Sequence, residues 1–354
     1  MHDEVNRWLL RRSWSVADRP VRRLLTAKRA AGRAGTVSVV LPALNEEATV
    51  GDIVRTIRAD LMHEVPLVDE VLVVDSGSTD GTREVARAAG ARVVTREELL
   101  PHWPVVPGKG EVLWRSLLAA RGEIICFVDS DLRDFSSDFV TGIIGPLLTE
   151  TSAADGGPVH FVKAMYDRPL EQGGSVEPAG GGRVTELVAR PLINLYWPRL
   201  AGFVQPLGGE YAARRSLLEQ LPFPCGYGVE LGLLVDTLHA VGLDAMAQVD
   251  VGVRRHRHQD GQALGRMAAT IHRTAVERQA RLTPQPRRIG TGPDGGLTAD
   301  LGDTLVQFDR VPGQGFRPKV HAVAADERPP MVRVPEYLAH RRSLEEVLPA
   351  GLAG

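Results

Sequence analysis

Some features are scarce in this sequence of 354 residues, and each scarcity excludes a class of protein. Its only two cysteines, Cys126 and Cys225, cannot form a disulfide framework, so we expect both to be reduced packing residues. No apolar run approaches the ~20 residues that cross a bilayer, and the N-terminus lacks the apolar core of a signal peptide. The sequence therefore predicts a cytoplasmic protein that has no transmembrane segment.

An excess of charge of one sign is also lacking, because 42 Lys and Arg residues against 44 Asp and Glu residues give a formal net charge of -2. Such a balance supplies no general field for binding nucleic acid. Residues 1–36 are locally basic and carry Trp8, Trp14 and several leucines, which favours an amphipathic helical arm packed on the body or on a second subunit. Contact with a membrane surface is the alternative. Repeats at solenoid spacing and long low-complexity tracts are absent too.

The most informative stretch is residues 123–133, an apolar run that ends abruptly at two aspartates. Residues i and i+2 of an extended segment point the same way, so Asp129 and Asp131 would repel each other unless a cation or protonation relieved them. A divalent metal that carries a phosphate explains the pair economically. The alternative is that the two carboxylates lie in a turn and cap the next helix.

Strand-like and helix-like patterns alternate around this stretch. Apolar or β-branched runs indicate strands at 37–42, 70–75, 92–95 and 249–253, and helical patterns cover 49–62 and the residues up to about 89. This alternation predicts an α/β fold with a doubly wound, mainly parallel sheet, in which ligands bind beyond the carboxyl ends of the strands. The motif-bearing loops follow such strand ends.

Three motifs, taken together and in this order, resemble those of family-two-like glycosyltransferases with the GT-A fold. They are LPALNEE at 41–47, VDSGSTDG at 74–81 and DSD at 129–131. Four later segments resemble the actinobacterial glucosyl-3-phosphoglycerate synthases, a family close to the mannosyl-3-phosphoglycerate synthases. These segments are GGGRVTELVARP at 180–191, QPLGGEY at 205–211, GYGVE at 226–230 and VRRH at 253–256.

This resemblance implies a metal-dependent enzyme that transfers glucose, with retention, from UDP-glucose to the 2-hydroxyl of 3-phosphoglycerate. It also implies Mg²⁺ or Mn²⁺ as cofactor and a homodimer. The alternatives are a mannosyl-3-phosphoglycerate synthase that uses GDP-mannose, a polyprenyl-phosphate glycosyltransferase and a catalytically silent nucleotide-sugar sensor. The expected division is an arm at 1–36, a nucleotide-sugar-binding α/β domain at 37–150, an acceptor-binding lobe at 151–275 and an extension at 276–354.

Lys109 opens a helical run that extends through Ala120. The helix macrodipole favours anions at this end, so an ammonium group there makes sense if a phosphate shares the spot. A solvated surface lysine is the alternative. By resemblance, Lys109 lies against the donor nucleotide.

Residues 180–185 read Gly-Gly-Gly-Arg-Val-Thr and precede a helical pattern that runs to about Tyr196. Unencumbered amides, a guanidinium group and a hydroxyl are the components of a phosphate site. A loop with an ordinary helix cap is the alternative. The resemblance makes Gly182, Arg183 and Thr185, together with Val184, candidates for binding 3-phosphoglycerate.

Two further segments receive roles by resemblance. Glu230 could be an ordinary carboxylate of a helix's first turn, but the family pattern brings it to the hydroxyls of the donor sugar. His256 matches the metal-binding histidine and would join Asp131, whereas His258 is an acceptor candidate at a position where the family commonly has an amide. A basic strand end exposed to solvent is the alternative for this segment.

The resulting site prediction assigns catalysis to Asp131, Lys109 and Glu230. The remaining donor-binding candidates are Pro42, Ala43, Leu44, Asn45, Glu46, Ser76, Asp129, Ser130, Tyr227 and Arg254.

Overall fold

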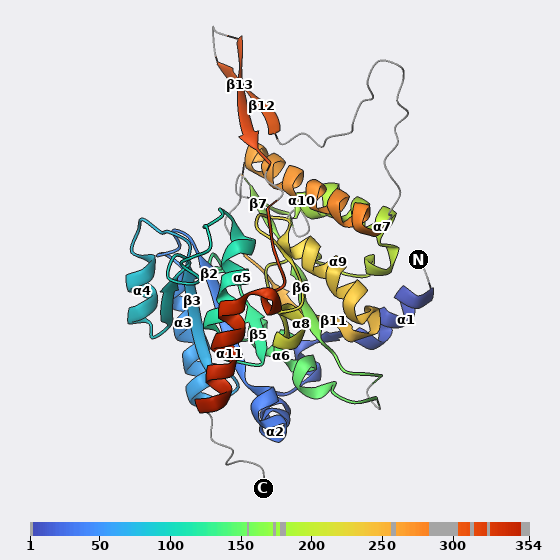
Figure 1. Ribbon diagram of the computed structural model, residues 1–354. Coiled ribbons are helices and arrows are strands. Elements are labelled where there is room, and N and C mark those ends of the chain that lie inside the picture. Colours follow the sequence, from blue (N-terminus) through green and yellow to red (C-terminus); the bar gives the residue numbers. More distant parts are fainter. Residues whose placement is uncertain are drawn as a thin grey trace.

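Eight of the described strands form one sheet in the computed structural model (Figure 1). The structure describes residues 3–153, 156–172, 175–177, 182–255, 260–282, 304–311, 315–323 and 326–347. Along the sheet the strand order is β1-β11-β6-β9-β5-β2-β3-β4. All neighbouring pairs are parallel except those of β9, which runs antiparallel to β5 and β6. The prediction of a doubly wound, mainly parallel sheet is confirmed.

The strands of this sheet are β1 (Ser13–Ser15), β2 (Val37–Ala43), β3 (Glu70–Asp75), β4 (Arg92–Thr95), β5 (Ile124–Phe127), β6 (Phe161–Asp167), β9 (Tyr211–Arg214) and β11 (Met246–Val253). The helices are α1 (Asp3–Arg12), α2 (Val21–Ala31), α3 (Val50–Arg58), α4 (Thr82–Ala88), α5 (Lys109–Ala119), α6 (Asp138–Thr149), α7 (Arg190–Tyr196), α8 (Arg215–Leu218), α9 (Val229–Val241), α10 (Gly261–Leu282) and α11 (Pro335–Val347).

Helices bury both faces of the sheet, and the strands therefore read as continuous apolar runs. In β5, Ile125 and Phe127 belong to the core beneath α5, α9 and α11. Ile124 and Cys126 point to the opposite face, into the core shared with α2, α3 and α6. Both cysteines of the chain are buried and unlinked, as predicted.

The basic N-terminal arm packs on the body, as one of the two readings of its sequence predicts. The indole of Trp8 is 1% exposed, donates a hydrogen bond to the Met246 carbonyl at 2.8 Å and lies 4.6 Å from the Phe203 ring between centroids. β1 then joins the edge of the main sheet beside β11. The amphipathic pattern of the arm is thus used to cover the body. No helix in the described ranges is long and apolar enough to span a bilayer.

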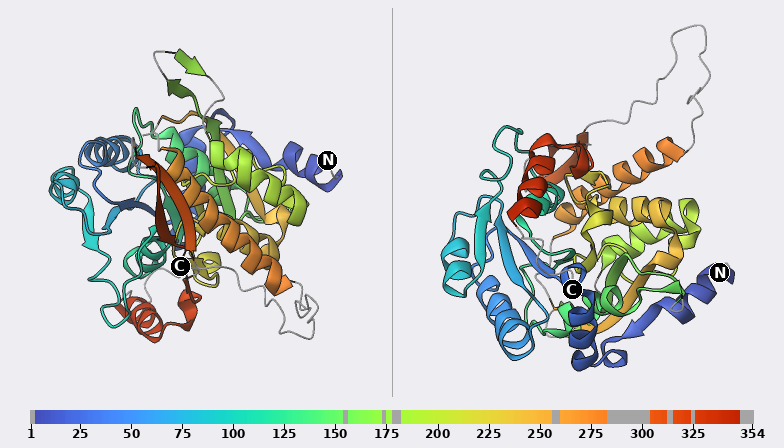
Figure 2. Two further views of the ribbon diagram at one scale, coloured as in Figure 1. Left: turned by 90° about the horizontal axis from the view of Figure 1, so that it is seen from above. Right: turned by 60° about the horizontal axis from the view of Figure 1, so that its bottom comes forward.

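Within the part of the chain that the structure describes, three smaller sheets lie outside the main one. β7 (Leu170–Gln172) pairs with β8 (Ser175–Glu177) in a hairpin that stands away from the body in the left view of Figure 2. β12 (Thr304–Val311) and β13 (Gly315–Ala322) form a hairpin that projects beyond α10 (Figure 1). β10 (Phe223–Pro224) pairs with β14 (Glu327–Arg328), which brings the C-terminal segment back to the body before α11.

The main sheet draws strands from three of the four predicted segments: β1 from the arm, β2 to β5 from the second segment, and β6, β9 and β11 from the third. The division into a donor domain and an acceptor lobe stays a prediction about function. Its consequence for the site is geometric, because loops from both segments end at the same edge of one sheet.

Candidate active site

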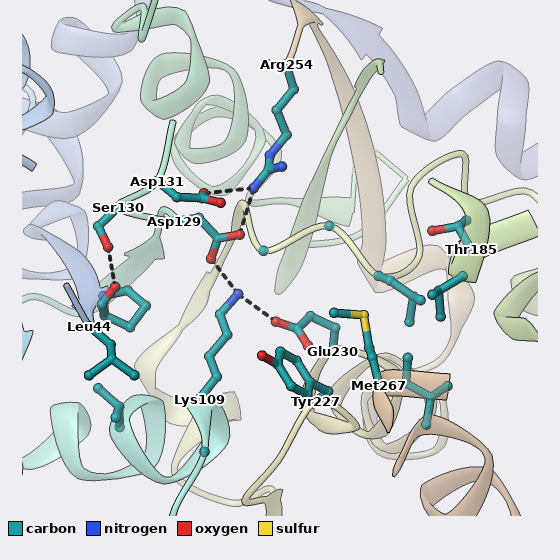
Figure 3. A pocket seen from close by; sticks show the side chains of 18 of the residues that line it. Leu44, Lys109, Asp129, Ser130, Asp131, Thr185, Tyr227, Glu230, Arg254 and Met267 are labelled. Atoms are coloured by element: carbon teal, nitrogen blue, oxygen red, sulfur yellow. Dashed lines mark hydrogen bonds and ion pairs between the residues drawn. The ribbon is translucent and has the colours of Figure 1, made fainter. Parts of the chain in front are cut away.

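A cavity of about 590 Å³ lies at the carboxyl edge of the parallel strands. Every described residue of the predicted site lines it except Asn45. The other predicted residues, His256 and His258, and the amides of Gly180 and Gly181 lie outside the described residues. Figure 3 shows that carboxylates and cations from β5, α5, α9 and the end of β11 converge in this cavity.

Asp129 follows β5 and lies between two cations. Its Oδ1 is 2.5 Å from the Lys109 ammonium, and its Oδ2 is 2.8 Å from a guanidinium nitrogen of Arg254. Burial would raise the pKa of Asp129, but the two cations lower it to about 2. This carboxylate is therefore ionised throughout the neutral range and is held in place from both sides.

Asp131 has a different environment, although it lies only two residues further on. Its contact with Arg254 is longer, at 3.4 Å, and 30% of its side chain is exposed. Burial raises its pKa, Arg254 opposes that rise, and the neighbouring Asp129 adds to it. Of the two aspartates, Asp131 thus has the carboxylate that gains more from a further cation.

A divalent ion fits this position through the chemistry of its donors. Carboxylate oxygen is a ligand that Mg²⁺ and Mn²⁺ prefer. Within the described ranges no group of three or more His, Cys, Asp or Glu side chains could hold a metal by itself. Asp131 would therefore share an ion with phosphate oxygens of a ligand, and the predicted His256 would complete the set.

Lys109 and Glu230 approach from two helices on one side of the cavity (Figure 3). Lys109 is the first residue of α5, Glu230 lies in the first turn of α9, and their charged groups are 2.8 Å apart. Burial would lower the pKa of Lys109, but Asp129 and Glu230 raise it well above its ordinary value. The ammonium group therefore keeps its charge inside the cavity.

Sequence reasoning gave no role to the residues that orient Arg254. Glu210 is fully buried and accepts bonds from Arg254 Nε and from the Tyr166 hydroxyl, both at 2.8 Å. Burial would lower the pKa of Arg254, but Glu210 and the site carboxylates raise it well above its ordinary value. The Gly-Gly-Glu of residues 208–210 belongs to a segment that carries the family resemblance, but its sequence does not indicate that Glu210 contacts Arg254 or Tyr166.

The loops after β2 and β3 form the end of the cavity that carries the donor candidates. Ser130 donates to the Pro42 carbonyl at 2.6 Å, and Ser76 donates to the Ala43 carbonyl at 3.0 Å. Asn45 adopts the left-handed region, with φ of 59°, and its side chain accepts from the Thr79 amide at 2.9 Å. In this structure Asn45 thus joins the two loops rather than lining the cavity.

The acceptor candidates occupy the opposite end. Gly182 has φ of 78°, and the Glu186 amide donates to its carbonyl at 3.0 Å. The helical region predicted to follow is present as a π-helical turn at Thr185–Ala189 and then α7. Arg183 and Thr185 line the cavity together with Arg168, which the sequence did not single out. Binding of the acceptor by these residues stays a prediction.

Gly209, the residue before Glu210, has no room for a side chain. A Cβ atom built at this position would lie 2.2 Å from Asp129 Oδ2. The backbone of residues 208–209 thus passes directly against the carboxylate that both cations hold. Only the absence of a side chain permits this approach.

Comparison with known proteins identifies this arrangement. The family model for glycosyl transferase family 2 matches residues 38–205. The glucosyl-3-phosphoglycerate synthase of Mycolicibacterium smegmatis is 50% identical over 326 residues, which are 92% of this chain and 97% of that protein. This chain belongs to the glucosyl-3-phosphoglycerate synthase family. It is therefore a glycosyltransferase with the GT-A fold, as predicted.

Solved structures support the same assignment. Glucosyl-3-phosphoglycerate synthase from Mycobacterium tuberculosis, in complex with Mn²⁺, UDP and phosphoglyceric acid, matches with a TM-score of 0.73 at 45% identity over 89% of this chain and 95% of that one. Another structure of that enzyme contains Mg²⁺ and UDP. Mannosyl-3-phosphoglycerate synthase from Rubrobacter xylanophilus matches with a TM-score of 0.82 at 40% identity over 93% of this chain and 99% of that one.

Proposed function

We propose that this enzyme transfers glucose from UDP-glucose to the 2-hydroxyl of 3-phosphoglycerate with retention of configuration. The observation that carries the proposal is that one cavity joins the Asp129, Asp131, Lys109 and Glu230 cluster to the loop of Arg183 and Thr185. The first set suits a sugar nucleotide with its metal, and the second suits a phosphorylated acid.

UDP-glucose is favoured over GDP-mannose by sequence rather than by backbone shape. The TM-score is higher for the mannosyl enzyme, at 0.82 against 0.73 for the M. tuberculosis glucosyl enzyme, whereas the identity over the same structural matches is lower, at 40% against 45%. A TM-score reports the backbone, and one fold accommodates different substrates. The donor is selected by the side chains that line the site, so the higher identity to the glucosyl enzyme favours UDP-glucose.

The metal would be Mg²⁺ or Mn²⁺, both of which occur with UDP in structures of the M. tuberculosis enzyme. Asp131 and His256 would hold it. When bound, a divalent ion neutralises charge that develops on the departing nucleoside diphosphate.

Lys109 supplies the second positive charge for that departure, because its ammonium lies in the cavity between Asp129 and Glu230. Such charge stabilisation is the dominant kind of contribution in reactions of this type. Glu230 is proposed to accept bonds from donor-sugar hydroxyls. Both Asp129 and Glu230 are engaged by cations, so we assign them positioning and electrostatic roles and name no carboxylate nucleophile.

The acceptor hydroxyl is then proposed to attack the anomeric carbon from the face that the diphosphate leaves, and the leaving phosphate helps to take its proton. Arg183, Thr185 and the Gly182 backbone would hold the phosphate of the acid at the far end of the cavity. Val184 lines the wall there. His258 is an acceptor candidate from the sequence alone.

Product analysis tests the proposal directly. Purified protein is incubated with 3-phosphoglycerate and either UDP-glucose or GDP-mannose, with Mg²⁺ or Mn²⁺, and products are identified by mass spectrometry and by NMR of the anomeric proton. An α-linked glucosyl product from UDP-glucose supports the proposal. Preferred use of GDP-mannose would reassign the donor, transfer to a polyprenyl phosphate would reassign the acceptor, and binding without turnover would indicate a sensor.

We further propose that the enzyme works in the cytoplasm as a homodimer. The polar face of the β12–β13 hairpin packs on α10, where Gln307 and Asp309 bond Gln262. Its other face points outward, and Phe308 and Val320 are 58% and 65% exposed. Light scattering compares the wild type with the double variant Phe308→Ser/Val320→Ser. A dimeric wild type and a monomeric variant would support a second copy on this apolar face.

A further inference from the structure

The C-terminal segment at residues 326–334 crosses the body next to the two loops that deliver Lys109 and Glu230 (Figure 1). β14 in this segment pairs with β10, and the Cys225 amide donates to the Asp326 carbonyl at 2.8 Å. Beyond it, the Trp114 indole of α5 donates to the Pro329 carbonyl at 2.8 Å. One short stretch of chain thus forms hydrogen bonds both with the segment that precedes α9 and with one side of α5.

Arg328 is the charged centre of this contact. Its guanidinium bonds both oxygens of Glu111, at 2.8 Å for Nη2 to Oε1, and also donates to the Pro104 carbonyl. Glu111 is fully buried in the first turn of α5, two residues after Lys109. A buried carboxylate of this kind is costly unless cations compensate it.

The second cation on Glu111 connects it to the loop before α5. Arg115 Nε lies 2.6 Å from Glu111, and its terminal nitrogens donate to four loop carbonyls within 3.3 Å as well as to that of Leu99. That loop ends at Pro107 and Gly108, which line the cavity beside Lys109. Arg328, Glu111 and Arg115 therefore hold the loop and the helix start as one unit.

The other loop is joined to the same unit by close backbone contact. The Glu111 amide donates to the Cys225 carbonyl at 3.2 Å, and a Cβ atom at Gly110 would lie 1.8 Å from the Pro224 carbonyl oxygen. From Cys225 the chain continues through Tyr227 to Glu230, both of which line the cavity. A shift of the Arg328 contact would therefore move Lys109 relative to Glu230.

We propose that Arg328 is a positioning residue for the donor site: through Glu111 it holds the beginning of α5 so that Lys109 stays between Asp129 and Glu230. This inference rests on the proposed function where it names the donor. It also assigns a role to the C-terminal extension, for which the sequence offered none.

The experiment compares Arg328→Met with Arg341→Met as a matched control. Arg341 also fastens the C-terminal extension, through an ion pair of 3.0 Å with Glu123, but neither partner lines the cavity. Calorimetry should show that Arg328→Met weakens UDP binding about two- to thirtyfold. Steady-state kinetics should show that the KM of Arg328→Met for 3-phosphoglycerate stays within about twofold of wild type. UDP binding by Arg341→Met should also stay within about twofold of wild type. Arg328→Lys should lie between, because lysine restores charge but not the two-pronged contact.

Two further measurements separate positioning from a merely structural role. In a Lys109→Met background, Arg328→Met should change UDP affinity by less than about twofold, because it acts through Lys109. An equal loss with and without Lys109, or wild-type affinity in Arg328→Met, would overturn the proposal. If Arg328→Met does not fold, the same comparison made with Arg328→Lys decides.

The contact of Arg328 with Glu111 and Pro104, which we call the tether, can also be tested without any ligand. A negative result for the tether can therefore be distinguished from a failure of the proposed function. Neutrophil elastase cleavage after Val105, which is 38% exposed, should be faster in Arg328→Met than in Arg341→Met when followed by mass spectrometry, because the loop loses the bond to Pro104. Equal cleavage rates would refute the tether. A wild type that does not bind UDP would instead refute the proposed donor.

Discussion

The Lys109 ammonium lies 2.8 Å from Glu230 Oε1, and the two residues occupy the first turns of different helices. A cation at a helix N-terminus opposes the macrodipole. Its position here is stabilised by Glu230 and by Asp129, so the pair couples α5 to α9 across the donor end of the cavity. The proposed transfer depends on this coupling.

Replacing Lys109 by Met should therefore lower kcat with UDP-glucose by about a hundredfold, the scale of losing one preorganised electrostatic group. Steady-state kinetics measures the loss, and Lys319→Met on the projecting hairpin serves as a control that keeps wild-type rates. The fold-loss in kcat of the double variant Lys109→Met/Glu230→Gln should be smaller than the product of the fold-losses of the two single variants. Strictly multiplicative losses would show that the two residues act separately.

Replacing Asp131 by Ala should abolish metal-dependent turnover, because the diphosphate would lose the cation held next to it. Asp134→Asn is the control, since Asp134 is on the same loop, its side chain is 73% exposed, and asparagine tolerates its left-handed backbone with φ of 52°. A metal titration of initial rates distinguishes the two variants. Activity of Asp131→Ala near that of wild type, at unchanged metal requirement, would remove Asp131 from the proposed metal site.

The strands were predictable because their signals are local. Residues 70–75 and 92–95 were predicted as strands and form β3 and β4 with these bounds. The helix expected from Lys109 is α5, and it ends one residue before the predicted end. Apolar runs bounded by turn residues, together with helical periodicity, contain enough information for such elements.

The supporting residues could not be predicted in this way. Glu210 meets Arg254 44 positions later in the sequence, and Glu111 meets Arg328 217 positions later. Nothing in the neighbouring sequence of either glutamate indicates a buried partner. Such contacts depend on the tertiary arrangement, which brings the end of β11 and the C-terminal segment to the same edge of the sheet.

Gly209→Ala should inactivate the enzyme although it adds a single methyl group. The new Cβ would lie 2.2 Å from Asp129 Oδ2, so Asp129 would have to leave its place between Lys109 and Arg254. Gly261→Ala provides a control, because a Cβ there meets nothing within 4 Å. Equal kcat/KM for both variants would show that Asp129 can move without consequence.

Lys163 predicts a pH-dependent contribution to stability. It is 1% exposed on β6 and donates to the Gly208 carbonyl at 2.7 Å, and burial lowers its pKa from the ordinary lysine value of 10.5 to about 8. Between these two values the unfolded chain binds the proton and the folded chain does not. Raising the pH from about 8 towards 10.5 should therefore increase this residue's contribution to the free energy of unfolding, by at most about 1.4 kcal/mol per pH unit.

Denaturant unfolding of the wild type and of Lys163→Met, measured at several pH values in that range, isolates the contribution. The stability of the wild type relative to the variant should rise with pH. A difference that stays constant across the range would contradict a lysine that is neutral in the folded state.

Arg183→Ala tests the acceptor end of the cavity. If Arg183 binds the phosphate of the acid, its loss should raise KM for 3-phosphoglycerate far more than KM for the sugar nucleotide, by roughly ten- to a hundredfold, because charge-assisted bonds contribute about 1.5–3 kcal/mol. Arg183→Lys should recover only part of the loss, since an ammonium lacks the planar two-pronged geometry. Arg190→Ala is the control, because Arg190 lies on the following helix and pairs with Glu186 at 2.8 Å.

The same assay should show a strong preference of the wild type for 3-phosphoglycerate over glycerate. Glycerate has a carboxylate but no phosphate, so the proposed phosphate contacts of Arg183 and the Gly182 backbone could not form with it. Arg183→Ala should reduce this preference by weakening only the reaction with the phosphorylated acid. Equal use of both acids by the wild type, or a defect of the variant confined to the donor, would show that the loop at Gly182–Thr185 serves another part of the reaction.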